Sequence, residues 1–224
     1  MSTLLFSSIL LIMKFLFFLY VDDIIITGSN STSIHNLIRE LGTQFAMKDL
    51  GPLYYFLGIE VHRDSNGIFL SQSKYSIDLL TRAYIDSAKA CTSPVSSHKR
   101  LSLIVGDSLD DATFYRSIVG GLQYLSMTRP DLAFSVNQAC QFMHAPTSEH
   151  LIAVKRILRF LKGTVDHGLY IGIGDLNLRA YCDADWAGDP DDRRSTSGFG
   201  VFLGPCLESL SHPETRVFCR IRAH

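Results

Sequence analysis

Apolar and polar residues alternate along the first part of the chain in two patterns, one typical of strands and one typical of a helix. Apolar runs on both sides of Asp22 and Asp23 predict a β-hairpin over 15–27, with the two acids at its turn. Residues 29–32 offer N-cap side chains for a helix. An apolar stripe at helical spacing follows and is expected to be buried, made of Ile34, Leu37, Ile38, Leu41 and Phe45. The chain is therefore predicted to begin with a hairpin and an amphipathic helix.

Glycine and proline end this helix, and a second hairpin is predicted after it. Gly51 and Pro52 stop the helical pattern, and the residues over 53–62 predict a strand. Asn66 and Gly67 predict a tight turn, with the returning strand at 68–70. A further helix is predicted over 74–84.

The second half of the chain is predicted to be helical first and β-stranded later. Residues 86–111 lack periodicity and carry Ser, Thr, Pro and acidic residues, which indicates a connecting loop. Helical spacing then predicts three helices, over 112–127, 131–143 and 148–162. From residue 176 the pattern predicts strands, at 178–183 and 198–203. Helices and strands in separate blocks favour the α+β class.

Composition narrows the class of protein. Hydrophobic residues make up 46% of the 224 residues and charged residues 19%, so most of the chain is expected to be globular, with one or two domains. The five cysteines are odd in number and lack Cys-x-x-Cys spacing, which argues against a regular zinc site and fits a reducing compartment. The formal net charge of −1 means that binding of nucleic acid would need a local basic face.

The apolar N-terminal segment, residues 1–14, permits two interpretations. One is a membrane anchor or secretory signal over 3–20. Lys14 interrupts the run, no basic segment precedes it, and the uninterrupted stretch is shorter than the roughly 20 residues that a spanning helix needs. We therefore expect no membrane partner, and interpret 15–19 as a buried strand that leads into Tyr20.

The motif Tyr-Val-Asp-Asp, from Tyr20 to Asp23, resembles the palm motif of the reverse transcriptases of copia-type LTR retrotransposons. The resemblance continues in family order over about 15–204. Its further segments are 24–28, 47–52, 55–60, 70–75, 115–120, 122–125, 128–131, 158–164, 182–188 and 194–198. The chain is also similar to uncharacterised proteins, related to the same Pol polyprotein, that open reading frames of plant mitochondrial genomes encode.

This resemblance implies RNA-directed DNA synthesis with associated RNase H, as part of a Pol polyprotein. It implies an α+β fold with a partial palm hairpin, a helical thumb and connection region, and a truncated RNase H-like β-hairpin. The implied division is an apolar N-terminal segment at 1–14, a partial palm with a primer-grip-like hairpin at 15–85, the loop at 86–111, the helical thumb and connection at 112–175, the start of an RNase H-like domain at 176–204, and a tail unlike the family at 205–224.

The resemblance also implies metal-dependent chemistry. Asp22 and Asp23 match the polymerase carboxylates and Asp183 matches the first RNase H ligand, so these residues are expected to bind Mg²⁺, with Mn²⁺ as the alternative. A two-ion polymerase site needs at least three carboxylates, and residues 1–21 contain no Asp or Glu. We therefore expect the fingers and the bridging carboxylate to be missing, and the chain alone to be catalytically incomplete. The acidic neighbours of Asp183 are expected to bind a cation only weakly: Asp185, Asp189, Asp191 and Asp192.

Two groups of residues are expected to contact nucleic acid. By resemblance, Tyr20 lies at the polymerase motif, and the hairpin with Phe56, Leu57 and Gly58 grips the primer strand, with Gly58 permitting a close approach. The alternative for this hairpin is ordinary amphipathic packing. On the helix over 148–162, the basic residues are candidates for phosphate contacts, with a solvated helix face as the alternative: Lys155, Arg156 and Arg159.

The expected partners are an RNA/DNA template–primer and the remainder of the Pol polyprotein, without a small-molecule cofactor. Two other functions stay open, a non-catalytic nucleic-acid-binding remnant and a non-functional pseudogene product. The resemblance implies the cytoplasm or nucleus for a retrotransposon product, and the mitochondrion for a relative of the plant reading frames.

The residues after 205 mix Ser, His and Arg with little strand pattern, so no strand is expected there.

Overall fold

The computed structural model is a mixed α and β chain that forms two compact units, residues 1–54 and residues 55–224. The described residues are 15–85, 87–96, 100–175, 177–184, 186, 188, 190, 191, 193, 195–204 and 206–211. The apolar segment 1–14 lies outside them. No helix among the described residues is long and apolar enough to cross a membrane.

The first unit contains the predicted hairpin and helix. Strands β1 (Phe15–Tyr20) and β2 (Asp23–Gly28) pair antiparallel, and helix α1 (Ser31–Gln44) contacts β2. Helix α1 begins where the side chain of Asn30 accepts a hydrogen bond from the backbone N–H of Ser33, at 3.1 Å. That bond satisfies one of the N–H groups that a helix start leaves unpaired. The N-cap therefore acts as predicted, but the stripe is not buried, because no residue of α1 is buried and Phe45 is 59% exposed. The expectation of a buried strand at 15–19 is also wrong, since Leu16, Phe18 and Leu19 are 41%, 40% and 51% exposed.

The second unit opens with a four-stranded antiparallel sheet, in the order β3-β4-β5-β6. Its strands are β3 (Tyr55–Phe56), β4 (Ile59–Arg63), β5 (Gly67–Ser71) and β6 (Leu169–Gly172). The predicted single strand over 53–62 is wrong in one respect, because a tight turn at Leu57 and Gly58 divides it into β3 and β4. Strand β6 was not predicted, since its partner β5 lies far away in the sequence.

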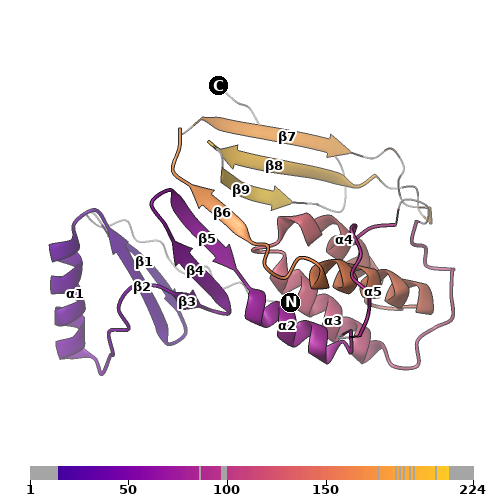
Figure 1. The fold of residues 1–224 in the computed structure, drawn as a ribbon, viewed down its shortest axis with the longest axis horizontal. Coiled ribbons are helices and arrows are strands. Elements are labelled where there is room, and N and C mark those ends of the chain that lie inside the picture. Colours follow the sequence, from indigo (N-terminus) through magenta and orange to yellow (C-terminus); the bar gives the residue numbers. More distant parts are fainter. Residues whose placement is uncertain are drawn as a thin grey trace. The chain divides into compact units, whose positions relative to one another are not determined.

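Four helices form the hydrophobic core of the second unit (Figure 1). They are α2 (Ser73–Arg82), α3 (Ala112–Leu125), α4 (Pro130–Gln141) and α5 (Ser148–Lys162). Helix α2 packs against α3 and α5, and α4 packs against α3 and α5. The side chains with no exposed surface include Leu79, Tyr115, Leu122, Leu125, Leu132, Val154 and Leu161. Burial of each leucine side chain contributes about 1.5–3 kcal/mol, so this cluster contributes strongly to the stability of the unit.

A separate three-stranded antiparallel sheet follows, in the order β7-β8-β9. It contains β7 (Leu178–Ala184), β8 (Ser197–Leu203) and β9 (Cys206–Ser211). The expectation of no strand after 205 is wrong for β9. Gly204 adopts a φ of 58°, which turns the chain so that Cys206 pairs with Leu203. Residues 212–224 of the predicted tail lie outside the described part.

Candidate functional site

The turn of the first hairpin carries Asp22 and Asp23. Tyr20 pairs with Asp23 across the strands, so Val21 and Asp22 are the two residues of the turn. Val21 has a φ of 48°, a conformation that costs a β-branched residue of order 1–3 kcal/mol, and its side chain is 85% exposed. Tyr20, Asp22 and Asp23 are all exposed. The hairpin therefore presents two adjacent carboxylates at an open tip.

A metal centre requires several ligands close together in space. A pair of divalent ions about 4 Å apart needs several carboxylates around it. In the described part of the chain, no three His, Cys, Asp or Glu side chains form a group that could hold an ion. Among these described residues, Asp22 and Asp23 offer two adjacent carboxylates.

Asp183 lies on β7, in the second unit. Its backbone pairs with Gly198 of β8, and its carboxylate accepts the N–H of Ala184 at 2.9 Å. The side chain is exposed. Its acidic neighbours Asp185, Asp189 and Asp192 lie outside the described residues.

Asp191, the described member of the acidic cluster, is exposed but hydrogen-bonded to the loop around Ser102. Its two carboxylate oxygens accept the Ser102 hydroxyl at 2.5 Å and the backbone N–H of Leu103 at 2.6 Å. The hydrogen bond from Ser102, and to a smaller extent the one from Leu103, holds the pKa of Asp191 below its usual range. The carboxylate therefore fixes the loop around Ser102, a role that the sequence did not indicate.

Ser102, His150 and Asp191 meet in space without forming a hydrolytic triad. The Ser102 hydroxyl donates to Asp191, whereas Nε2 of His150 faces the backbone carbonyl of Ser102 at 3.2 Å. Nδ1 of His150 accepts the backbone N–H of Thr147 at 2.9 Å. The imidazole does not contact the Ser102 hydroxyl, so it cannot act as a base that activates this serine. The contacts instead hold the loop around Ser102 against the start of α5.

The turn between β3 and β4 contains two of the residues expected to contact the primer. Leu57 and Gly58 have φ values of 47° and 77°, the pattern of a type I′ hairpin turn. The hydroxyl of Tyr124 on α3 donates to the carbonyl oxygen of Leu57. A Cβ added at Gly58 would lie 3.3 Å from that hydroxyl oxygen. Gly58 therefore allows the positive φ of the turn and leaves room for the Tyr124 hydroxyl beside it. Tyr124 lies in the segment 122–125, but no local pattern in the sequence indicates its contact with Leu57.

The basic residues of α5 hold a stretch of the preceding loop. Arg156 Nε donates to the carbonyl of Ser93 at 3.1 Å, and Arg159 Nε donates to the carbonyl of Lys89 at 2.6 Å. The Lys162 ammonium donates to the carbonyl of Ala88 at 3.0 Å. We call residues 88–93 the strap. Arg156 and Arg159 are half-buried against the strap and so do not lie on a freely solvated helix face. Lys155 is exposed.

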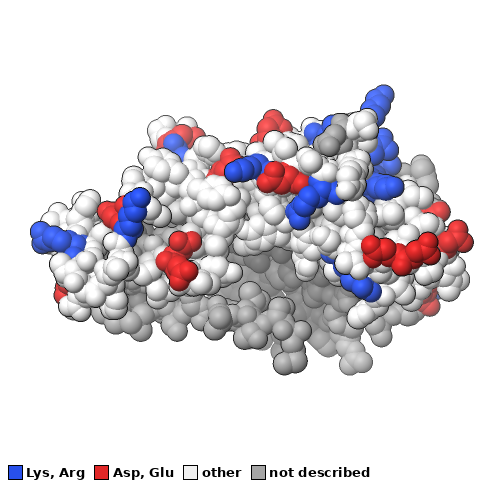
Figure 2. Space-filling model, turned by 90° about the horizontal axis from the view of Figure 1, so that it is seen from below, with Lys and Arg blue, Asp and Glu red and all other residues white. Residues whose placement is uncertain are grey.

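The basic side chains of α5 and the strap are candidates for a local basic surface. Among the described residues, no ion pair involves Lys89, Lys155, Arg156 or Arg159. Figure 2 shows Lys and Arg interspersed with Asp and Glu on the face that it draws, in keeping with the net charge of −1. A basic surface on this chain is therefore local, and these four residues on α5 and the strap are its best candidates.

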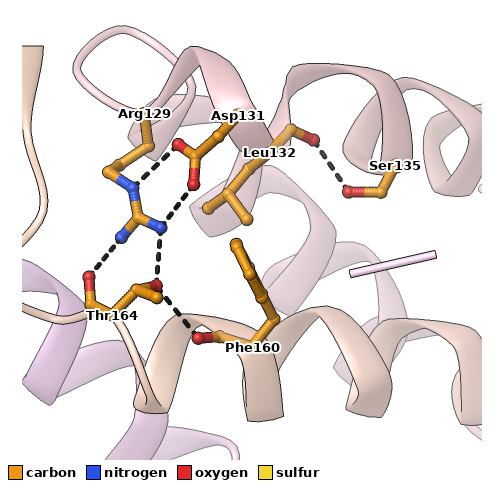
Figure 3. A network of polar contacts seen from close by, with 6 residues as sticks. All are labelled: Arg129, Asp131, Leu132, Ser135, Phe160 and Thr164. Atoms are coloured by element: carbon orange, nitrogen blue, oxygen red, sulfur yellow. Dashed lines mark hydrogen bonds and ion pairs between the residues drawn. The ribbon is translucent and has the colours of Figure 1, made fainter. Parts of the chain in front are cut away.

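Arg129, in the segment 128–131, is a structural residue (Figure 3). Its guanidinium is 2% exposed and makes a bidentate pair with Asp131, at 2.9 and 2.7 Å. It also donates to the carbonyl and the hydroxyl oxygens of Thr164, both at 2.7 Å. The Thr164 hydroxyl in turn donates to the carbonyl of Phe160 at 2.9 Å. Arg129 thus joins the start of α4 to the end of α5 and has no surface left for a phosphate.

Comparison with known proteins gives these observations a family context. The sequence model of the family "Reverse transcriptase (RNA-dependent DNA polymerase)" matches residues 5–97. The chain is 53% identical over 186 residues to the retrovirus-related Pol polyprotein from transposon RE1 of Arabidopsis thaliana, and the match covers 83% of this chain but 13% of the polyprotein. The Pol polyprotein from transposon TNT 1-94 of Nicotiana tabacum is 40% identical over 190 residues, covering 81% of this chain and 14% of that polyprotein.

A shorter relative matches over most of its own length. An uncharacterised mitochondrial protein of Arabidopsis thaliana is 48% identical over 194 residues, which cover 86% of this chain and 80% of that protein. No solved structure matches. The similarity thus extends over most of this chain, while the chain spans only a small part of the Pol polyproteins.

Proposed function

The chain belongs to the reverse transcriptase family of copia-type retrotransposon Pol polyproteins, and from that premise we propose that it binds an RNA/DNA template–primer duplex without polymerising DNA unaided. In this proposal the duplex is contacted by the hairpin with Phe56, Leu57 and Gly58, and by the basic face of α5. Tyr20, Asp22 and Asp23 belong to a polymerase centre that other parts of a Pol polyprotein complete.

The observation that carries the binding proposal is the arrangement of Arg156 and Arg159 on α5. Each guanidinium donates through Nε to a strap carbonyl. An arginine has five N–H donors, so the Nη groups remain to donate to phosphate oxygens. Because the strap already orders both side chains, less conformational entropy is lost when a phosphate binds. Lys155 adds an exposed positive charge on the same helix.

The proposal that the chain does not polymerise unaided rests on its donor set. Asp22 and Asp23 offer two carboxylates, and the described residues bring no third acidic, histidine or cysteine side chain to them. Two carboxylates hold a pair of Mg²⁺ or Mn²⁺ ions poorly, because too little negative charge faces the ions. When bound, such ions would activate the attacking primer hydroxyl and orient the transferred phosphate. By themselves, the two aspartates contribute one side of that site.

Two assays on the purified chain test the proposal. In the first, a labelled RNA·DNA hybrid should shift in a native gel at low salt, and failure to shift would contradict the binding role. In the second, the same hybrid with a recessed primer should not be extended in Mg²⁺ or in Mn²⁺. Extension that is abolished by Asp22→Asn would show that the chain is a complete polymerase.

A related experiment separates a Pol component from a binding remnant. If the chain serves a polymerase, adding the remainder of a Pol polyprotein in trans should restore extension, and Asp23→Asn in this chain should remove it again. Binding without restored extension would favour the non-catalytic remnant. Neither binding nor restoration would favour the pseudogene product.

A further inference from the structure

The turn at Leu57 and Gly58 is strained, and one side chain from a distant helix holds it. Leu57 has a φ of 47°, a conformation that type I′ turns usually give to Asn, Asp or Gly. A leucine there is disfavoured because its Cβ crowds the following carbonyl. A strained residue persists only where the surrounding structure fixes it, and such positions gather at functional sites.

Tyr124 on α3 is the residue that fixes the turn. Its hydroxyl donates to the carbonyl oxygen of Leu57, 67 positions earlier in the sequence. Its ring packs edge-on against the ring of Tyr75, with centroids 5.1 Å apart, and the Arg82 guanidinium lies 5.8 Å from the centroid of Tyr75. The hydroxyl is therefore held in place by two further side chains before it meets the turn.

The turn itself presents apolar and aromatic surface to solvent. Leu57 is 36% exposed and Tyr55, at the start of β3, is 56% exposed. Packing inside the protein does not account for an exposed leucine in an unfavourable conformation, since Asn at this position would form the same turn with less strain. Exposed aromatic and aliphatic side chains on a rigid support are suited to contact sugars and bases of a nucleic-acid strand.

We propose that Tyr124 is a positioning residue that fixes the Leu57 turn as a rigid contact for the nucleic-acid strand. This inference rests on the proposed function, because the strand is that of the bound RNA·DNA hybrid. It adds to that function a residue on another helix, which does not itself touch the nucleic acid. It also assigns to Leu57 a role in binding that a glycine or asparagine in the same turn would lack.

The test compares two tyrosines on the same helix. Tyr124→Phe keeps the ring and removes the hydroxyl that donates to the carbonyl oxygen of Leu57. We expect the Kd for the hybrid to rise roughly two- to ten-fold, because the turn is no longer fixed for the strand, and the urea midpoint to fall by no more than the loss of one hydrogen bond explains. The matched control is Tyr115→Phe, since the Tyr115 hydroxyl donates to the carbonyl of Ala139 at 2.8 Å inside the core. That variant should lower the urea midpoint and leave the Kd unchanged.

A second variant separates binding from stability. Leu57→Asn should raise the urea midpoint by relieving the strain, and should weaken binding of the hybrid several-fold. If Leu57→Asn raised both stability and affinity, or if Tyr124→Phe left the Kd unchanged, the inference would be overturned.

Hydrogen exchange of the chain without nucleic acid tests the positioning role of Tyr124 independently of binding. Tyr124→Phe should speed the exchange of the amides in 55–60, while those of the core helices keep their protection. Wild-type chain that fails to bind the hybrid would contradict the proposed function and, with it, the contact that the turn makes. Unchanged exchange at 55–60 would contradict the positioning role of Tyr124, whether or not the hybrid binds.

Discussion

Nε of Arg159 donates to the carbonyl oxygen of Lys89 at 2.6 Å, so that a helix residue holds a loop residue 70 positions earlier in the chain. The return contact is the backbone N–H of Cys91, which donates to the carbonyl of Arg159 at 3.2 Å. The strap and α5 are thus bound to each other in both directions. The arginine side chains of α5 hold the strap, and these contacts also fix the orientation of their guanidinium groups.

Removing one guanidinium should loosen the strap without unfolding the core. We expect Arg159→Ala to lower the free energy of unfolding by about 1–2 kcal/mol, because one charge-assisted hydrogen bond is lost at a half-buried site. Hydrogen exchange in 88–93 should become faster. Lys155→Ala, on the same helix but exposed, is the control and should leave that exchange as it is. Equal effects of the two substitutions would show that the strap does not depend on Arg159.

Arg129 should be the most sensitive arginine of the helical body. Arg129→Ala leaves the carbonyl of Thr164 without its donor and Asp131 without its partner. Because the Asp131 side chain is 39% exposed and can be solvated, the loss of the charge-assisted hydrogen bonds of Arg129 should cost about 1.5–3 kcal/mol, which should appear in the urea unfolding curve. Arg63→Ala, on an exposed strand position, should change stability by no more than about 0.5 kcal/mol. A loss below about 1 kcal/mol for Arg129→Ala would contradict the role assigned to the network in Figure 3.

His150 should make stability fall in mildly acidic solution. The side chain has no exposed surface, and burial lowers its pKa from the usual 6.5, against smaller opposing effects of the Ser102 carbonyl, Asp191 and Glu149. A lowered pKa means that the unfolded chain binds more protons. The stabilising contribution is therefore complete above pH 6.5 and is lost as the pH falls through the folded-state value.

The measurement is urea unfolding between pH 7.5 and pH 5. The decrease attributable to His150 should approach about 1.4 kcal/mol per pH unit at most, and His150→Gln should remove it. His144→Gln is the control, because His144 is exposed, and it should keep the wild-type pH dependence. Identical pH profiles for wild type and His150→Gln would refute the prediction.

Gly67 should be intolerant of any side chain. A Cβ built there would lie 2.2 Å from the carbonyl oxygen of Ile171, a backbone atom of the neighbouring strand β6. Gly67→Ala should therefore destabilise the second unit by about 1–3 kcal/mol through overpacking. Gly42→Ala in α1 is the matched control, because nothing lies within 4 Å of the added atom. That change should stabilise α1 by about 0.5–1 kcal/mol, since alanine is the better helix former. If both substitutions behaved alike, the close approach of β5 and β6 would be excluded.

Local patterns in the sequence predicted the elements that local chemistry determines. The stripe from Ile34 to Phe45 and the N-cap before it give α1, and the apolar spacing after residue 148 gives α5 with its buried Val154 and Leu161. The acidic turn at Asp22 also lies where the flanking apolar runs place it. These features depend on neighbours within a few residues, so the sequence is sufficient to predict them.

The features that were missed depend on partners far away in the chain. Strand β6 exists because it pairs with β5, and the Leu57 turn is held by Tyr124. The strap contacts of Arg156 and Arg159 reach back to carbonyls in a loop without periodicity. Backbone carbonyls are present at every residue, so no sequence pattern indicates which of them an arginine will find.

The salt dependence of binding to an RNA·DNA hybrid tests the central claim most directly. Fluorescence anisotropy would give the Kd of wild type and of Lys155→Ala from low to moderate salt, with Lys48→Ala in the first unit as the control. The account predicts that log Kd rises linearly with log salt, that Lys155→Ala weakens binding, and that this variant reduces the slope by about 1. Binding that is absent at low salt, or a slope that Lys155→Ala and Lys48→Ala leave equally unchanged, would contradict it.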